Sequence, residues 1–262
     1  MGARETDTWQ PDVYARFAAE RRQPFLDLAE RVASIPGGRA VDLGCGTGEL
    51  TRELHVRTGA AETLGLDSSE AMLAKAVPLA GDGLGFERAD IAAFAARAEY
   101  DLVFSNAALH WVPDHPALLA RLAAALRPGG QLAFQVPDNF DHPSHRAAER
   151  VAAEEPFRSS LAGAAHPRHV LAPEAYAAIL FRLGFETPRV ALRVYGHRLD
   201  SREGVVQWVE GSLLSEYRRS LPPELYPRFV ERYRGVLFGM IADEHPYFFT
   251  FRRILAYGRL RA

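Results

Sequence analysis

The stretch VDLGCGTGEL, residues 41–50, places three glycines at alternate positions directly after a short apolar run. A dinucleotide-binding loop has the spacing G-x-G-x-x-G, whose last glycine lets the following helix pack closely. Glu49 occupies that last position here. A carboxylate at the start of a helix competes with phosphate for the same N–H groups, whereas glycine still lets a ligand approach the backbone closely. The loop therefore favours a ligand without phosphates.

Two further acidic residues stand at the ends of the next two predicted strands. Asp67 lies 19 residues after Gly48, which matches the distance expected for a carboxylate that binds ribose hydroxyls. Asp90 ends the following strand and is placed to meet an adenine amino group. Together these residues predict a nucleoside with a charged tail and no phosphates, and S-adenosylmethionine fits that description. The alternatives are a tight strand-to-helix turn for the glycines and a plain helix cap for Asp90.

The elements that must position these residues alternate along the first half of the chain. Continuously apolar strands that alternate with helices predict a mostly parallel, doubly wound α/β sheet with helices on both faces. Strands are predicted at 39–43, 62–67, 84–90, 100–107 and 131–137, and helical stretches at about 47–58, 68–76, 91–98 and 114–126. RPGG at 127–130 predicts a break after the last of these helices. Two later strands, at 189–197 and 248–258, bring the sheet to seven strands.

Residues 202–243 read as helical and carry several aromatic side chains, which predicts a helical cap inserted before the last strand. We therefore expect a single domain over residues 1–262. Its parts are an N-terminal lid helix at 1–32, a cofactor-binding core at 33–137, a loop, helix and strand at 138–200, the cap at 201–247 and the final strand at 248–258.

The composition excludes several classes of protein. The 262 residues carry a net charge of −2, and Cys45 is the single cysteine, so an intrachain disulfide is impossible. Neither a membrane span nor the apolar core of a signal peptide is present. We expect a cytoplasmic protein, with a monomer favoured and with neither nucleic acid nor membrane as a partner. The residues from Arg189 onward contain 13 Arg and 8 acids, an excess that suits an anionic substrate or a solvated face.

Candidates for a second, acceptor site follow the strands at their carboxyl ends, where open α/β sheets bind ligands. Arginine suits the recognition of carboxylates, and an imidazole can donate a hydrogen bond. Two H-P-x-H pairs, His142/His145 and His166/His169, lack further ligands in a fixed geometry, so no metal site is expected. The candidates are His110, Trp111, Gln135, Asn139, His142, His145, Tyr195, His197, Arg252 and Arg253. Neighbouring strand residues face opposite sides, so only one of the two arginines can face the site.

Several stretches of the chain resemble the class I methyltransferases and, within them, the trans-aconitate methyltransferase family. They are WQPDVYARFAAERRQP (9–24), VDLGCGTGELT (41–51), GLDSSEAML (65–73), SNAALHWVPDH (105–115) and QVPDNFDHPSH (135–145), with weaker agreement at 195–199, 205–214 and 251–255. The resemblance covers most of the chain. It is loosest over residues 211–247, where we expect the acceptor to be chosen.

The resemblance implies a role for each matching residue. The glycine loop would hold the methionine part of S-adenosylmethionine, the next two strand ends would hold its ribose and adenine, and the N-terminal segment with Trp9 would close over it. The cofactor residues implied are Tyr14, Arg21, Asp42, Gly44, Cys45, Gly46, Gly48, Asp67, Ser68, Met72, Asp90, Ile91 and Asn106. Asn106 would lie beside the sulfonium, and His110 would donate a hydrogen bond to the acceptor.

The expected activity is O-methylation of a carboxylate on a small polycarboxylic acid such as trans-aconitate. A carboxylate is already ionised at neutral pH, so the site must orient and desolvate it rather than deprotonate it. Two alternatives remain open from the sequence. The acceptor can be a carrier-bound malonyl group or a natural-product hydroxyl, or the protein can bind the cofactor without catalysis.

Overall fold

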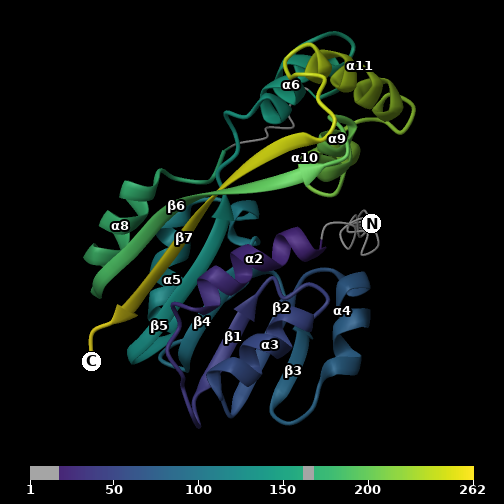
Figure 1. Cartoon of the computed structure of the whole chain (residues 1–262). Coiled ribbons are helices and arrows are strands. Elements are labelled where there is room, and N and C mark those ends of the chain that lie inside the picture. The colour runs from purple at the N-terminus through teal and green to yellow at the C-terminus, as the bar shows by residue number, and fades with distance from the viewer. Residues whose placement is uncertain (1–17, 162–167) are drawn as a thin grey trace. The chain divides into compact units, whose positions relative to one another are not determined.

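The computed structural model describes residues 18–161 and 168–262 (Figure 1). Within these ranges, seven strands form one sheet in the order β3-β2-β1-β4-β5-β7-β6. The strands are β1 (Arg39–Leu43), β2 (Glu62–Asp67), β3 (Leu84–Arg88), β4 (Tyr100–Asn106), β5 (Leu126–Pro137), β6 (Phe185–Leu199) and β7 (Tyr247–Leu260). The pairs from β3 through β5 are parallel, and β7 runs antiparallel to β5. The mostly parallel seven-stranded sheet predicted from the sequence is confirmed.

The chain divides into two compact units. One unit, here called the sheet unit, comprises Ala18–Asp138, His169–Arg193 and Arg252–Ala262. Its helices are α2 (Ala18–Ala29), α3 (Glu49–Thr58), α4 (Glu70–Ala76), α5 (His115–Ala125) and α8 (Pro173–Arg182), with short 3₁₀ turns η1 (Val77–Leu79), η2 (Ile91–Ala93) and η3 (Leu109–Trp111). The other unit, here called the cap unit, contains Asn139–Arg168 and Val194–Phe251.

Aromatic contacts show that helices cover both faces of the sheet. Phe25 of α2 packs edge-on against Phe104 of β4, with ring centroids 5.6 Å apart. Phe134 of β5 packs in the same way against Tyr176 of α8, at 5.3 Å. Phe134 pairs with Ser105, the neighbour of Phe104, and successive strand residues face opposite sides. Helices α2 and α8 therefore lie on opposite faces of the sheet.

The predicted helical stretch at 91–98 is wrong. The chain forms only the three-residue turn η2 there and then runs on to β4. Within 91–98, Phe94 is the one large side chain that becomes buried. A short helix costs free energy to nucleate and is stabilised mainly by packing of an apolar face, so a single buried anchor does not support one.

The RPGG break ends a helix as predicted, because α5 stops at Ala125. The strand, however, begins at Leu126 and includes these four residues. Leu126 pairs with Tyr100, but Gln131 already pairs with Leu102, so the ladder is irregular between them. RPGG is therefore an excursion within β5, and Gly129 adopts the positive φ (76°) that such an excursion needs.

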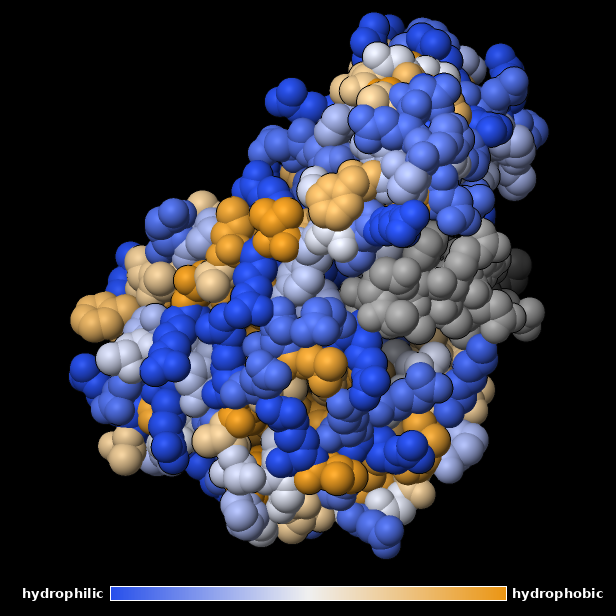
Figure 2. All heavy atoms as spheres, viewed as in Figure 1, coloured by the Kyte–Doolittle hydropathy of each residue, from blue (hydrophilic) through white to orange (hydrophobic). Residues whose placement is uncertain are grey.

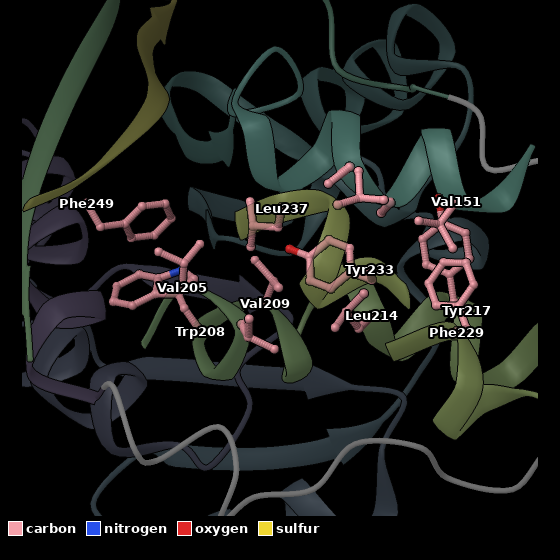
Figure 3. Packing of buried hydrophobic residues seen from close by; sticks show 14 of the residues in the cluster. Val151, Val205, Trp208, Val209, Leu214, Tyr217, Phe229, Tyr233, Leu237 and Phe249 are labelled. Carbon is pink, nitrogen blue, oxygen red and sulfur yellow. The ribbon is translucent and has the colours of Figure 1, made fainter. Parts of the chain in front are cut away.

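The cap unit has its own apolar core (Figure 3). Its helices are α6 (Pro143–Ala152), α7 (Phe157–Ser160), α9 (Glu203–Glu210), α10 (Leu213–Ser220) and α11 (Tyr226–Phe238), which agrees with the helical character predicted for 202–243. Tyr217 stacks on Phe229 with ring centroids 4.6 Å apart, and Trp208 meets Phe249 edge-on at 5.5 Å. Such pairs stabilise a core beyond the area that they bury.

The surface is mostly hydrophilic on the face shown in Figure 2, with separate apolar clusters. Exposed large apolar side chains include Val56, Phe181 and Phe248. Among the helices that the structure describes, none is long and apolar enough to cross a membrane.

The hydroxyl of Tyr233 predicts an unusual stability effect. Tyr233 is fully buried in the cap core, and among the described residues its Oη has no hydrogen-bond partner. An unsatisfied buried hydroxyl costs roughly 1–3 kcal/mol. We expect Tyr233→Phe to raise the free energy of unfolding in chemical denaturation. The control is Tyr257→Phe, which removes a hydroxyl that donates to Gln131 Oε1 at 3.0 Å and should lower it. A loss of stability in both variants would contradict the assignment.

Candidate active site

The predicted functional residues of the sheet unit gather at one edge of the sheet. Because β2, β1, β4 and β5 are parallel, their carboxyl ends meet at the same edge. Asp67 ends β2, Asp42 lies one residue before the end of β1, and Asn106 ends β4 opposite Gln135 of β5. Arg253 reaches the same edge from the antiparallel strand β7, where it pairs with Pro137.

The glycine loop after β1 adopts positive φ at Gly44, Gly46 and Gly48, at 79°, 56° and 78°. A side chain at Gly44 would place its Cβ 2.2 Å from Ala108 Cβ, and one at Gly48 would come within 2.8 Å of Phe86 and Ala76. Within the described part of the chain, nothing lies within 4 Å of a Cβ built at Gly46. Packing therefore requires glycine at the first and third positions, whereas Gly46 leaves its backbone beside open space.

Asp67 holds the glycine loop in place. Its Oδ2 accepts a hydrogen bond from Gly46 N at 2.9 Å, and its Oδ1 accepts one from Ser69 N at 2.9 Å. Ser69 caps α4, because its Oγ accepts from Met72 N at 3.2 Å. The carboxylate predicted to bind a ribose thus lies against the loop predicted to bind the methionine part. Of the two residues predicted to border the adenine, Ser68 is exposed and Met72 is buried.

Asp42 is buried at the centre of the edge, with only 4% of its surface exposed. Thr51 Oγ1 donates a hydrogen bond to its Oδ2 at 2.6 Å, and Oδ1 finds no hydrogen-bond partner among residues 18–161 and 168–262. Burial raises the pKa of this carboxyl to about 7. Burial likewise raises the pKa of the Cys45 thiol far above its usual value, so the thiol stays neutral. An acid in this setting is suited to a cationic group such as an ammonium.

The residues after β3 contact the site in two ways. Asp90 is exposed and caps η2, because its Oδ1 accepts from Ala92 N at 2.8 Å. The plain cap that was the alternative for Asp90 is therefore present, and its role toward an adenine stays a prediction. Ile91 lies beside the glycine loop, with its Cδ1 3.5 Å from a Cβ built at Gly44.

A chain of side chains runs from β4 to β7. Gln135 Nε2 donates a hydrogen bond to Asn106 Oδ1 at 3.0 Å, and Arg253 Nη1 donates one to Gln135 Oε1 at 3.1 Å. Arg253 is only 5% exposed. The neighbouring Arg252 instead forms an ion pair with Asp138 at 2.7 Å. The expected division of the two arginines between different partners is therefore present, and Arg253 is the one linked to Asn106.

The turn after β4 carries His110 and Trp111, both half-buried. Their rings are in contact, with centroids 4.6 Å apart. Ala107, at the start of this loop, has a φ of 56°, and its N–H donates to Gln135 O at 2.9 Å. The turn is thereby fixed next to the Asn106–Gln135 pair.

Two predicted acceptor residues, Asn139 and His142, belong to the cap unit. Both are described only within that unit. His142 caps α6 by accepting a hydrogen bond from Ser144 N at 3.1 Å, and Ser144 Oγ lies 2.9 Å from His142 Nδ1 and 3.2 Å from His145 Nδ1. Burial lowers the pKa of both histidines to about 4. Both imidazoles are therefore neutral at physiological pH.

The remaining calls on the N-terminal segment are not tested. Trp9 and Tyr14 lie outside the described residues, and so does the side chain of Arg21. The sequence gave no signal for Thr51, whose hydroxyl binds Asp42, or for His115 and Tyr176, which are bonded to each other beneath the His110 turn. A threonine in the first turn of a helix that follows an acidic strand is the one pattern that points to such a pair.

The charge excess of the C-terminal part of the chain is resolved by the division into units. The cap unit carries 11 Arg and 12 acidic residues over Asn139–Arg168 and Val194–Phe251. The excess of arginine therefore belongs to the portions of β6 and β7 in the sheet unit, which include Arg252 and Arg253.

Solved structures share this fold. An S-adenosylmethionine-dependent methyltransferase from Mesorhizobium loti matches with a TM-score of 0.51 at 24% identity, over 91% of this chain and 97% of that one. The YcgJ protein from Bacillus subtilis matches with a TM-score of 0.61 at 13% identity, over 92% and 99%. At these identities the likeness shows the fold.

The fold and the site together define a class I S-adenosylmethionine-dependent methyltransferase, and the family model "Methyltransferase domain" matches residues 14–188. The trans-aconitate 2-methyltransferase of Deinococcus radiodurans is 44% identical over 95% of this chain and 96% of its own length. That of Methylobacterium nodulans is 41% identical over 96% of each chain. The chain belongs to the trans-aconitate 2-methyltransferase family.

The residues at the sheet edge fit S-adenosylmethionine. Asp42 offers a buried carboxylate oxygen, Gly46 offers backbone beside open space, and Asp67 stands between them. When bound, the cofactor supplies an electrophilic methyl group on a sulfonium, and its tail carries an ammonium.

Asp42 predicts a pH dependence of stability in the unliganded protein. Because its folded pKa of about 7 exceeds its unfolded value, the folded state binds a proton that the unfolded state lacks between these two values. Asp42 thus destabilises the protein above pH 7, and stability is gained as the pH falls, by about 1.4 kcal/mol per unit at most. We expect Asp42→Asn to be more stable than the wild type at pH 8 and equally stable near pH 5, by thermal unfolding. A difference that does not change with pH would contradict this.

The glycine loop predicts different outcomes at two positions. Gly48→Ala should destabilise the protein strongly, because its Cβ would collide with Phe86 and Ala76. Gly46→Ala should fold with a loss of about 1–2 kcal/mol for a left-handed alanine but bind S-adenosylmethionine at least tenfold more weakly. Thermal unfolding and calorimetric titration measure the two effects. Undiminished binding by Gly46→Ala would remove this backbone from the cofactor site.

Proposed function

We propose that the enzyme transfers a methyl group from S-adenosylmethionine to a carboxylate of trans-aconitate or a closely similar polycarboxylic acid, which yields a methyl ester. The observation that carries this proposal is the Arg253–Gln135–Asn106 chain beside the glycine loop. Relatives named trans-aconitate 2-methyltransferase, at 44% and 41% identity over nearly the whole chain, support it.

The cofactor part of the proposal assigns each acid a task. The Asp42 carboxylate binds the ammonium of the cofactor tail, which offsets the cost of keeping this acid buried and ionised. Asp67 accepts hydrogen bonds from ribose hydroxyls while it still holds the Gly46 N–H. The backbone at Gly44 and Gly46 lies along the methionine part. Asp90, Ile91, Ser68 and Met72 border the adenine.

The acceptor part rests on the order of the strands. From β1 the sheet passes through β4 and β5 to β7, so Arg253 lies three strand spacings from the glycine loop, about 14 Å. That distance accommodates the methyl donor at one end and a small polyacid at the other. The buried guanidinium of Arg253 binds one acceptor carboxylate, and Gln135 orients it. Asn106, between the two ends, lies beside the sulfonium.

His110 donates a hydrogen bond to the acceptor, and Trp111 covers it on the same turn. Water is excluded where the acceptor carboxylate meets buried partners, which raises its reactivity toward an electrophilic methyl group. Arg252 plays no direct part, because its charge is matched by Asp138. Asn139 and His142 of the cap unit remain proposed acceptor residues.

The test is product analysis with methyl-labelled S-adenosylmethionine. Trans-aconitate, cis-aconitate, isocitrate and a malonyl thioester are offered separately at millimolar concentration. We expect a labelled methyl ester from trans-aconitate, detected by mass spectrometry and lost on alkaline hydrolysis. A product formed with the malonyl thioester and not with the tricarboxylates would move the acceptor to the carrier-bound class. No product from any acceptor, with normal cofactor binding, would favour a non-catalytic binding protein.

The two neighbouring arginines provide a matched pair of variants. Arg253→Ala removes a charge-assisted hydrogen bond to the acceptor, worth ~1.5–3 kcal/mol, so the KM for trans-aconitate should rise roughly ten- to a hundredfold. Arg252→Ala should change this KM by less than about threefold and instead lower the melting temperature, because it deprives the buried Asp138 of its ion pair.

Calorimetry provides the control for this pair, because both variants should bind S-adenosylmethionine as tightly as the parent. Arg253→Lys separates charge from shape, since lysine cannot form a planar fork, and we expect an intermediate KM. Equal KM values in both alanine variants would place the anion site elsewhere, with His110, Asn139 and His142 tested next.

A further inference from the structure

His115 is the first residue of α5 and lies beneath the turn that carries His110. It is only 2% exposed, and its Nε2 is 3.0 Å from Leu109 O. A carbonyl oxygen can only accept a hydrogen bond, so Nε2 must carry the proton and donate. Burial lowers the pKa of His115, which favours the neutral ring. Nδ1 of the same ring is then left as an acceptor.

Tyr176 supplies the matching donor from α8. Its hydroxyl lies 2.5 Å from His115 Nδ1, and its Oη accepts a hydrogen bond from Leu171 N at 3.2 Å. A single arrangement of protons satisfies all these groups. The hydrogen bonds run from Leu171 N–H to Tyr176 Oη, from Tyr176 O–H to His115 Nδ1, and from His115 Nε2–H to Leu109 O.

The turn that this chain reaches is conformationally demanding. It is bracketed by Ala107 and Asp114, with φ values of 56° and 51°, and neither is glycine. Left-handed backbone at such residues costs of order 1–3 kcal/mol each and persists only where surrounding contacts hold it. On its other side the turn presents Ala108 to Gly44, so closely that a Cβ at Gly44 would collide. A small relaxation of the turn would therefore move His110 relative to the glycine loop.

We propose that His115 and Tyr176 are positioning residues for methyl transfer, which act by holding the Leu109–Trp111 turn so that His110 faces the acceptor. This inference rests on the proposed function, because it gives His110 a task in that reaction. Neither residue contacts the acceptor or the cofactor in this account. Their effect passes through one backbone carbonyl, that of Leu109.

Two substitutions of His115 separate this positioning role from simple core packing. The side-chain amide of glutamine reaches as far as imidazole Nε2, whereas that of asparagine reaches only as far as Nδ1. His115→Gln therefore keeps a donor for Leu109 O and weakens the contact with Tyr176. His115→Asn keeps a partner for Tyr176 and loses the bond to Leu109 O. Both replace one buried ring by a smaller amide, so their packing losses are similar.

We expect His115→Asn to lower kcat at least tenfold, while the dissociation constant for S-adenosylmethionine, measured by calorimetry, changes less than about threefold. His115→Gln should retain kcat to within about threefold. Tyr176→Phe keeps the ring contact with Phe134 and should give an intermediate kcat, which preserves the test if His115→Asn fails to fold. Equal kcat values for the two His115 variants at equal folded fraction, or a larger loss for His115→Gln, would overturn the proposal.

A second readout does not need an acceptor. The His110 and Trp111 rings are in contact, so the indole N–H resonance of Trp111, assigned with Trp111→Phe, reports the conformation of the turn by NMR. This resonance should shift in His115→Asn and stay near its wild-type position in His115→Gln. An identical resonance in all variants would refute the positioning role. If the wild type methylates none of the acceptors, the proposed function fails while this measurement still decides whether His115 holds the turn.

Discussion

The site depends on the narrow passage through which the chain leaves β1. The backbone must turn into α3 between Ala108 on one side and Phe86 with Ala76 on the other, and neither side leaves room for a Cβ at Gly44 or Gly48. Because that space is filled by neighbours, the loop backbone lies close to the β4 turn and close to β3. The open side at Gly46 then becomes the place where a ligand can meet the backbone. Close packing and ligand access are thus produced by the same three glycines.

Charge is graded along the sheet edge. The acids Asp67 and Asp42 stand on β2 and β1, the neutral amides of Asn106 and Gln135 on β4 and β5, and Arg253 on β7. A cationic donor and an anionic acceptor are therefore each drawn toward opposite ends of one row, with neutral hydrogen-bonding groups between them. The buried Asp42 is costly without a cation, so donor binding relieves an electrostatic penalty that the unliganded fold carries.

The parts of this picture that the sequence predicted are those with a local signature. The strands, the glycine loop and the position of Asp67 follow from apolar runs, from alternating glycines and from a fixed spacing, and the structure contains them. The failed helix at 91–98 had alanine-rich composition without a periodic apolar face, so propensity alone was misleading. The choice between Arg252 and Arg253 needed the register of β7 against β5. The bonds of His115 to Tyr176 and to Leu109 join positions far apart in the chain, which no local pattern reports.

The order of strands in the sheet differs from their order in the chain at one place, and this affects how the molecule is made. Strand β7 lies between β5 and β6, although β6 is synthesised some fifty residues earlier, as their bounds show. While the ribosome is still extending the chain, β6 has no neighbour to pair with and β5 keeps one edge open. Only when Tyr247–Leu260 emerges can both strands complete their ladders, so the last step of folding follows the end of translation. Until then the nascent chain carries two unpaired edges, which are the surfaces that chaperones cover and that aggregation exploits.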